Sequence, residues 1–427
     1  MQFLRHYPLR LLAEPARVVI RPFHIASEPR DLNPQQMERT RRIVGAVLAL
    51  PEETCESILE LINRDFGTRH WQTREVYLGR YKRIAEDDLR MKQELSDVRR
   101  QVIGAHFCHE YSYAAAAIMN PSIVPHVDQS GLSPGAQRFI LSLRTVGEGH
   151  ISSISFREGI IDAEGEMTLW PQPPFSMALD SEPIAGDDVV VAHLPASAPI
   201  SGGVVFPFTP AQHNGLEDLR LVQFDKGDGA HTYFGTYTAY SGSAIRSELI
   251  ATDDFRRYTL TPLRGAGSVG KGMGLFPRHI DGGYAMIGRQ DSESMYYMQS
   301  DDLLRWDGGE KIIAPKYPWE LVQMGNCGAP IELDEGWLLL THGVGALRQY
   351  SIGAALLDKK DPRKVLARSV TPFLSPSAET REGYVPNVVY TCGALKHGDT
   401  LLVPYGVADS SVSFVLVDTR ALLLSMT

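Results

Sequence analysis

HTYFGTYTAYSGSAIRSELIATDDF, which runs from His231 to Phe255, gives the clearest indication of the fold. It contains a strand-length run of apolar, aromatic and β-branched residues, a polar turn with glycine, a second such run and a turn with aspartates. Units of similar texture recur elsewhere in the chain, before this stretch at residues 138–156 and after it at residues 283–306, 336–362 and 399–419. A recurring two-strand unit of this kind indicates a repeated β architecture.

These five units predict a mainly β fold, a five-bladed β-propeller with an N-terminal, mostly helical extension. Repeated four-stranded blades leave only short sheet edges and surround a central cavity. A β-sandwich with long loops is the alternative. We place the helical region at residues 1–103 and the propeller, as the catalytic domain, at residues 104–427, because glycine, proline and β-branched residues dominate after about Gly104.

The first hundred residues have helical patterns. The segment PEETCESILELINRDF begins with Pro51 and acidic residues, which are signals for the start of a helix. The preceding NPQQMERTRRIVGAVLAL is similar, and a third stretch, from about Arg80 to Val102, is rich in charged residues and leucine without glycine or proline. Ahead of them, RVVIRPF resembles a short strand.

Composition narrows the function classes. The chain has 427 residues, 43% of them hydrophobic, and a net charge of -9, so it can form a sizeable core and is poorly suited to bind nucleic acid. Its four cysteines form no CxxC pair, which argues against zinc and favours a reducing compartment. We find no signal peptide and no apolar run of the ~20 residues that a membrane span needs. We therefore expect a cytoplasmic protein with no metal and no cofactor.

Charged residues gather at a few strand ends. In GLEDLRLVQF, Glu217 and Asp218 precede an apolar strand. Neighbours on an extended chain alternate faces, so one carboxylate could face a cavity while the other pairs with Arg220; a solvated turn with a salt bridge is the simpler interpretation. Lys271 and Arg289 flank a probable turn, where two adjacent strands could bring both cations to one end of a blade, or leave both at the surface.

Two further polar residues follow apolar runs. His342 ends WLLLTHGVG and Asp409 ends VPYGVAD. A histidine in such a place is most often a structural hydrogen-bonding residue, and an isolated aspartate there carries little information.

Taken together, these strings resemble glycoside hydrolase family 130, which contains β-mannoside phosphorylases and some β-mannosidases. The resemblance extends from about Glu110 to the end of the chain. Its motifs occur in the family's order: MNPSIV, GLEDLR, KGMGLFP with GYAMIGR, GNCGAPIELDEGWLLLTHGV, YSIGAALLDKKDP, GYVPNVVY and PYGVAD. The family's fold is a five-bladed propeller, which agrees with the number of repeated units.

The resemblance implies a role for each matching residue. Asp218 corresponds to the family's general acid, whose proton is thought to reach the glycosidic oxygen through a sugar hydroxyl. The phosphate-binding positions of phosphorolytic members correspond to Lys271, Arg289, His342 and Tyr350. Around the sugar, we expect Asn120, Arg144, Glu217 and Asp409.

This pattern favours phosphorolysis. An inverting glycosidase needs a carboxylic acid and a second carboxylate that activates water. A phosphorylase needs only the acid, together with cations that hold the anionic nucleophile. We therefore expect an inverting, reversible β-mannoside phosphorylase, a glycosyltransferase-type enzyme of carbohydrate metabolism, that uses inorganic phosphate and gives α-mannose 1-phosphate and an acceptor sugar.

Two alternatives stay open at this point. Many phosphorolytic relatives carry another arginine where this chain has His150, Ser152 and Ser153, and Glu148 or Glu217 could serve as a base, so an inverting β-mannosidase is possible. A non-catalytic sugar-binding propeller is the other. We expect a β-mannoside and phosphate as partners and a homo-oligomer formed through the N-terminal helices.

Overall fold

The computed structural model describes residues 3–23, 33–183, 188–227 and 229–427, and it is mainly β, as predicted. The chain folds into two compact units. The larger unit comprises residues 1–15, 113–172 and 179–427, and the smaller one residues 16–112 and 173–178. Within the described residues, none of the helices combines the length and the apolarity that a membrane span requires.

The smaller unit is helical with one short β-ladder. Its strands β2 (Val18–Pro22) and β3 (Cys108–Ser112) pair antiparallel. The other elements are α1 (Asn33–Leu48), α2 (Glu52–Phe66), α3 (Thr73–Tyr81), a π-helical segment (Lys82–Asp88), α4 (Asp97–Ala105) and β8 (Met177–Ala178). The predicted helix after Pro51 and the predicted strand in RVVIRPF are both confirmed.

The third predicted helix, from Arg80 to Val102, is wrong as a continuous element. The chain leaves helical geometry after Asp88 and starts α4 only at Asp97, where the Ser96 side chain accepts a hydrogen bond from the Arg99 amide. Leu89, Met91 and Leu95 in the gap pack against the core of this unit. Charge and leucine content alone do not reveal such a break.

A glycine permits a close contact between two helices of this unit. A Cβ atom at Gly104 in α4 would lie 1.9 Å from the carbonyl oxygen of Tyr77 in α3. Only glycine allows the two backbones to approach so closely. The core beside this contact includes Val44, Cys55 and Phe107.

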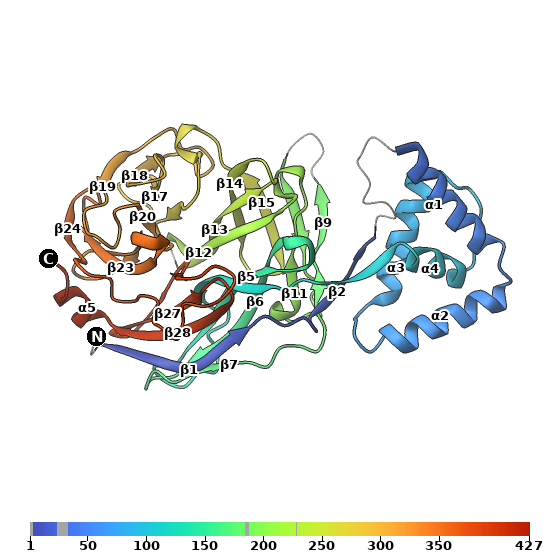
Figure 1. Ribbon diagram of the computed structural model, residues 1–427, viewed down its shortest axis with the longest axis horizontal. Helices are drawn as coiled ribbons and strands as arrows, with labels where there is room; N and C mark the ends of the chain where they lie inside the picture. The colour runs from blue at the N-terminus through green and yellow to red at the C-terminus, as the bar shows by residue number, and fades with distance from the viewer. Residues whose placement is uncertain (1–2, 24–32, 184–187, 228) are drawn as a thin grey trace. The chain divides into compact units, whose positions relative to one another are not determined.

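In the larger unit, the strands form antiparallel groups that follow one another along the chain (Figure 1). The first group is β4 (Ala117–Pro125), β5 (Gln137–Val146), β6 (Ser152–Ile161) and β7 (Met167–Leu169), with β11 (Gly203–Val205) also on β6. The second is β12 (Gly215–Gly227), β13 (Ala230–Tyr240), β14 (Ile245–Thr252) and β15 (Arg257–Pro262), continued by β10 (Val190–His193) and β9 (Asp180–Pro183). A parallel pairing of Gly215 with Ser152 in β6 joins these first two groups into one sheet.

Three further groups follow. The third is β16 (Gly274–Leu275), β17 (Tyr284–Gly288), β18 (Met295–Ser300) and β19 (Glu310–Ile313). The fourth is β20 (Gln323–Asn326), β22 (Trp337–Val344), β23 (Tyr350–Leu357) and β24 (Val365–Arg368), with β21 (Ile331–Glu332) on β22. The fifth is β25 (Val389–Tyr390), β27 (Thr400–Val407), β28 (Ser411–Asp418) and β1 (Leu4–Leu12), with β26 (Leu395–His397) on β27 and α5 (Thr419–Leu424) after β28.

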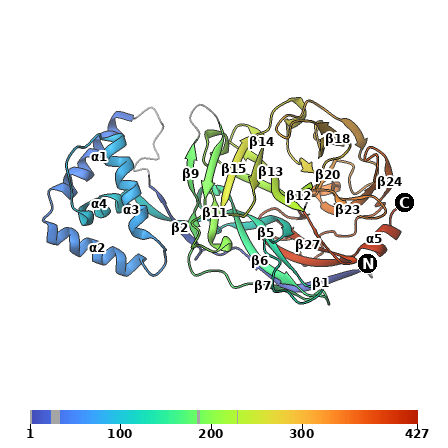
Figure 2. The ribbon, with the colours of Figure 1, turned by 180° about the vertical axis from the view of Figure 1, so that it is seen from behind.

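The fifth group joins the two ends of the chain. Strand β1 pairs antiparallel with β28, from Leu4 opposite Val417 to Leu12 opposite Ser411, and the two lie side by side in both views (Figures 1 and 2). The first residues of the chain therefore complete a sheet of the larger unit, a long-range pairing that the sequence pattern did not indicate.

The first strands of neighbouring groups are tied to one another. In β4, the Ser122 hydroxyl accepts a hydrogen bond of 3.0 Å from the Leu221 amide in β12. The Pro121 carbonyl accepts one of 2.8 Å from the Cys392 amide, just after β25. Strand β22 is buried at all eight positions, and β4 at eight of nine. These buried strands fix the backbone from which the polar side chains described below project.

Candidate active site

A cavity of about 210 Å³ lies where the five strand groups of the larger unit contribute polar side chains. Asn120 in β4, Arg144 in β5 and Asp218 in β12 come from the first two groups. The remaining lining residues come from the other three groups, the loops between them and the rest of β12: Arg220, Lys271, Gly272, Arg289, Gln323, Gly325, Asn326, His342, Arg348, Tyr350, Val388, Tyr390 and Asp409.

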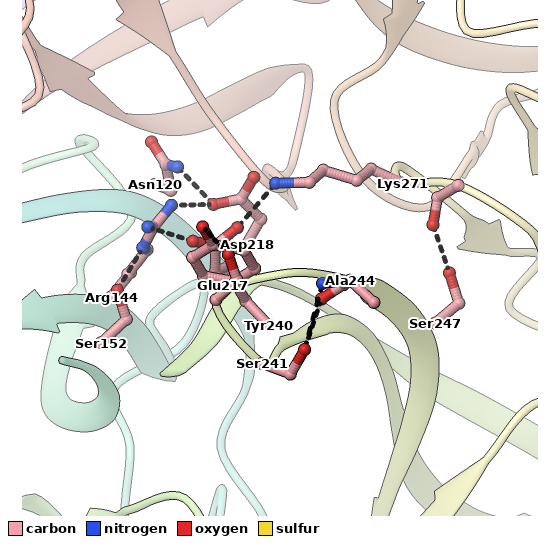
Figure 3. Close-up of polar contacts among 12 residues, drawn as sticks. Asn120, Arg144, Ser152, Glu217, Asp218, Tyr240, Ser241, Ala244, Ser247 and Lys271 are labelled. Carbon is pink, nitrogen blue, oxygen red and sulfur yellow. Dashed lines mark hydrogen bonds and ion pairs between the residues drawn. The ribbon is translucent and has the colours of Figure 1, made fainter. Parts of the chain in front are cut away.

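The Asp218 side chain turns into this cavity because β12 is irregular there. The register of β12 with β13 shifts between Glu217 and Arg220, and Asp218 has a positive φ of 57°. Aspartate tolerates this left-handed conformation better than most residues. One carboxylate oxygen of Asp218 accepts hydrogen bonds from the Asn120 amide and, at 3.0 Å, from Arg144 (Figure 3).

Three cations lower the pKa of Asp218. Burial raises this pKa, but the charges of Arg144, Arg220 and Lys271 outweigh burial and bring it down to about 2. The carboxyl is therefore ionised in the free protein at neutral pH. Arg220 also donates a hydrogen bond of 2.8 Å to the Asp218 carbonyl and one of 2.7 Å to the Tyr390 hydroxyl. These two bonds fix its guanidinium at the cavity wall.

Glu217 lies behind the cavity wall and does not belong to the lining residues. Its two oxygens accept from Arg144 at 2.7 Å and from Lys271 at 2.7 Å (Figure 3). The two adjacent carboxylates separate only in part, because both accept from Arg144, and the partners of Glu217 are Arg144 and Lys271, not Arg220. The carboxylate thus balances two of the cations that face the cavity.

His342 and Arg289 form a second polar pair. Arg289 lies 3.3 Å from Nε2 of His342, and because a guanidinium only donates, Nε2 must be the acceptor and the ring proton must be on Nδ1. Burial, and then the charges of Arg289 and Arg220, hold the His342 pKa well below its usual value. His342 is therefore neutral, and it stacks on Tyr350 with ring centroids 6.1 Å apart.

A glycine makes room for this histidine. A Cβ atom at Gly325 would lie 2.6 Å from Cε1 of His342. Nearby, Gln323 donates 3.3 Å to the Tyr350 hydroxyl. Nε of Arg289 is buried and has no hydrogen-bond partner among the described residues. A buried donor of this kind is costly unless a ligand or water satisfies it.

Asp409 lies in the same cavity but in a different environment. Ala408 and Asp409 both have φ of 49°, at the turn between β27 and β28. Burial first, and then the charge of Asp218, raise the pKa of Asp409 to about 6, against the opposing effects of Arg144 and Arg348. The two cavity aspartates therefore differ strongly in proton affinity.

The cavity is strongly basic. Five cationic side chains and two carboxylates line it, and Glu217 adds a third carboxylate behind them. With both cavity aspartates ionised and His342 neutral, as at neutral pH, this leaves a formal excess of two positive charges. A site of this charge and size can hold a small dianion next to a neutral polar ligand.

The structure brings together nearly all of the residues singled out from the sequence. Asn120, Arg144, Asp218, Lys271, Arg289, His342, Tyr350 and Asp409 all line the cavity, and Glu217 stands directly behind it. The roles proposed for them stay predictions. Glu148 is exposed and is not a lining residue.

Sequence reasoning missed several lining residues. Arg348, Gln323, Asn326 and Tyr390 come from segments that carried no recognisable charge pattern. Arg348 supplies a guanidinium from the loop before β23, although His150, Ser152 and Ser153 occupy the place where an arginine was sought. In that place, the Ser152 hydroxyl accepts a hydrogen bond of 2.9 Å from Nε of Arg144. Nδ1 of His150 lies 3.0 Å from the Tyr384 hydroxyl.

Comparison with protein families gives one match. Residues 201–426 match the glycoside hydrolase 130 family model, which is described as beta-1,4-mannooligosaccharide phosphorylase. This range includes β12, with Asp218, and every later strand group. It covers more than half of the chain.

Individual relatives are similar over about half of this chain. A 1,2-beta-oligomannan phosphorylase of Thermoanaerobacter sp. (strain X514) is 34% identical over 223 residues, which cover 50% of this chain and 71% of that protein. A beta-1,2-mannobiose phosphorylase of Listeria innocua serovar 6a is 35% identical over 220 residues, which cover 49% of this chain and 59% of that protein.

The fold resembles solved structures as well. The Listeria innocua beta-1,2-mannobiose phosphorylase, in complex with beta-1,2-mannobiose, superposes with a TM-score of 0.51 at 22% identity. The match covers 73% of this chain and 92% of that one. At this level of identity, the likeness concerns the fold alone.

Proposed function

The chain belongs to glycoside hydrolase family 130, and from this premise we propose that it is an inverting β-mannoside phosphorylase. It cleaves a β-mannoside with inorganic phosphate and gives α-mannose 1-phosphate and an acceptor sugar, in a reversible reaction. The relatives named above are phosphorylases of β-mannosides, which supports this assignment.

The excess of positive charge in the cavity carries the proposal. A hydrolase needs a carboxylate that is free to activate water. Water is uncharged, so it does not need surrounding cations to hold it. Of the two glutamates considered as a base, Glu217 is already bound by Arg144 and Lys271, and Glu148 is exposed. A phosphate dianion would balance the two excess positive charges. The β-mannosidase alternative is therefore not favoured.

The geometry suggests how the reaction is arranged. Lys271 and Arg289, with neutral His342 and Tyr350 beside them, hold phosphate below the anomeric carbon. Asp218 protonates the leaving oxygen, through a sugar hydroxyl as in the family. The sugar is held by Asn120, Arg144 and Asp409 on the other side of the cavity, and Glu217 orients Arg144 and Lys271 rather than touching the sugar.

We extend the proposal to the architecture. The five strand groups become the blades of a five-bladed propeller, and β1 completes the last blade by pairing with β28. The contributions of all five groups to one cavity support this arrangement. The division into residues 1–103 and 104–427 stays a prediction, as do the absence of a cofactor and an oligomer formed through the N-terminal helices. The four unpaired cysteines support a cytoplasmic location.

The reverse reaction tests the proposal. The protein is given α-mannose 1-phosphate with mannose, glucose, N-acetylglucosamine or β-mannobiose, and phosphate release is measured. Release that requires an acceptor, and that is lost in Asp218→Asn and strongly reduced in Lys271→Met, supports a phosphorylase. Lys226→Met removes an exposed lysine paired with Asp253 and serves as the matched control. Phosphate-independent cleavage of β-mannosides would contradict the proposal.

A further inference from the structure

Asp409 is a cavity carboxyl without a counterion contact. It lines the same cavity as Asp218, and no hydrogen bond or ion pair to its side chain is found within the described residues. Asp218, in contrast, accepts hydrogen bonds from Asn120 and Arg144. The two aspartates thus line the same cavity, but only Asp218 has hydrogen-bond donors in contact with its carboxylate.

The nearby cations are committed elsewhere. Arg144 donates to Ser152, Glu217 and Asp218. Lys271 donates to Glu217. The charged groups that act on Asp409 are Asp218 from β12, Arg144 from β5 and Arg348 from the loop before β23.

Arg348 forms no ion pair with Asp409 among the described residues, although its charge acts on the carboxyl. Its side chain is exposed, and its guanidinium carbon lies 5.8 Å from the centre of the Tyr350 ring. A largely buried carboxyl that has a carboxylate neighbour and no donor in contact favours the protonated form. This follows from the placement of the groups, and the pKa of about 6, raised by burial and then by Asp218, agrees with it.

We propose that the protonated form of the free enzyme, which prevails at mildly acidic pH, holds the proton of its reaction on Asp409 and not on Asp218. When the sugar and phosphate bind, the proton passes to Asp218 through a sugar hydroxyl or a water molecule in the cavity. Asp409 is then the proton-holding residue of the site, and Asp218 delivers the proton. This inference rests on the proposed function for the reaction itself, but the protonation state can be measured without catalysis.

The proton balance closes within one turnover. The bond from the anomeric carbon to the glycosidic oxygen breaks, and a phosphate oxygen forms the new bond from the opposite face. The leaving oxygen takes the proton that Asp218 received from Asp409. Hydrogen phosphate brings its own proton, so the sugar phosphate forms as a monoanion and returns that proton to the aspartate pair. No net proton is taken from solvent.

Phosphate provides the reason for the transfer. In the free site, the charges of Arg144, Arg220 and Lys271 keep Asp218 ionised. A dianion beside Lys271 and Arg289 raises the proton affinity of both aspartates, and that of Asp218 more strongly, because the charge of Lys271 acts on Asp218. Asp218 can therefore accept the proton only in the loaded site, which protects the enzyme from protonating a substrate before phosphate is present.

Infrared difference spectroscopy on the whole protein tests the assignment, because protonated carboxyls absorb apart from carboxylates. Spectra are compared at pH 5 and pH 8 for the wild type, Asp409→Asn and Asp218→Asn. We expect one protonated-carboxyl band that disappears as the pH rises through about 6, is missing in Asp409→Asn and persists in Asp218→Asn. Saturating sulfate, a dianion at every pH used, should move its disappearance to higher pH.

Two outcomes would overturn the inference: a band that is lost in Asp218→Asn and kept in Asp409→Asn, or a wild-type spectrum without the band. The wild-type titration needs no variant, so a misfolded variant would not leave the question undecided. Failure of the phosphate-release assay would contradict the proposed function and leave the infrared result standing, which separates the two.

Discussion

The ammonium group of Lys271 lies 2.7 Å from Oε2 of Glu217, so a cation at the cavity surface is fixed by a carboxylate behind it. The other Glu217 oxygen receives Arg144 in the same way. Glu217 is therefore the anchor of two cavity cations, while its neighbour Asp218 faces the cavity. The irregularity of β12 between Glu217 and Arg220 makes this division possible.

Replacing Glu217 tests the anchor. Glu217→Gln keeps the shape of the side chain, which is 9% exposed, but removes the negative charge that binds two cations. We expect the free energy of unfolding to fall by about 2–4 kcal/mol, because breaking a buried ion pair leaves its partners uncompensated. Urea denaturation measures this. Glu166→Gln, which removes an exposed ion pair with Arg5, should change stability by less than about 1 kcal/mol. Equal effects would argue against the anchor.

The sequence predicts the cavity well where a motif links residue type to a strand end. Lys271, Arg289 and Asp409 flank strands, whereas Asp218 and His342 lie within β12 and β22, and the fold brings all five to one cavity. Alternation of faces along a strand predicts neither the irregularity of β12 that turns Asp218 into the cavity nor the partners of Glu217. Those partners come from β5 and from a loop, far away in the sequence.

What could not be predicted depends on long-range packing. Arg348 lines the cavity because two consecutive residues, Leu347 and Arg348, adopt positive φ values of 54° and 55°, which no residue preference indicates. The pairing of β1 with β28 joins segments about 400 residues apart, so local patterns carry no trace of it. In the helical unit, the break after Asp88 serves the packing of the core and leaves no glycine or proline signal.

His342 should act as a neutral hydrogen-bonding group. Burial, Arg289 and Arg220 hold its pKa far below neutral, so it does not titrate between pH 6 and 8. Calorimetry with sulfate should therefore give the same pH profile for the wild type and His342→Gln, with only modestly weaker binding. Arg289→Gln removes a charge and should weaken sulfate binding about tenfold or more. A profile that changes shape in His342→Gln would show a charged histidine.

Strand β1 should stabilise the larger unit. Deleting residues 1–12 exposes the edge of β28 that now pairs with Leu4–Leu12. We expect the melting temperature to fall by about 5 °C or more and the protein to associate through the open edge. Calorimetry and size-exclusion chromatography measure both effects. A peptide of residues 1–15 added in trans should restore the melting temperature, and an unchanged melting temperature without it would contradict the role of β1.

The two cavity aspartates should affect stability with opposite signs. The folded-state pKa of Asp218, about 2, lies below that of an unfolded chain, so its ionised form stabilises the protein above pH ~4 and this contribution is lost as the pH falls toward 2. Asp218→Asn should therefore destabilise by about 2–3 kcal/mol at pH 5 and by less at pH 8, because removing the Asp218 charge also lowers the pKa of Asp409. The folded-state pKa of Asp409, about 6, lies above the unfolded value. The contribution of Asp409 to the stability of the protein is therefore lost as the pH rises from ~4 to 6. Asp409→Asn should stabilise by up to about 2–3 kcal/mol at pH 8 and hardly at all at pH 4. Urea denaturation across this range measures both differences, and each variant is the matched control for the other, since both exchange one cavity aspartate for its amide. If both variants destabilised equally at pH 8, Asp409 would have to be ionised and paired like Asp218, and it could not hold the proton.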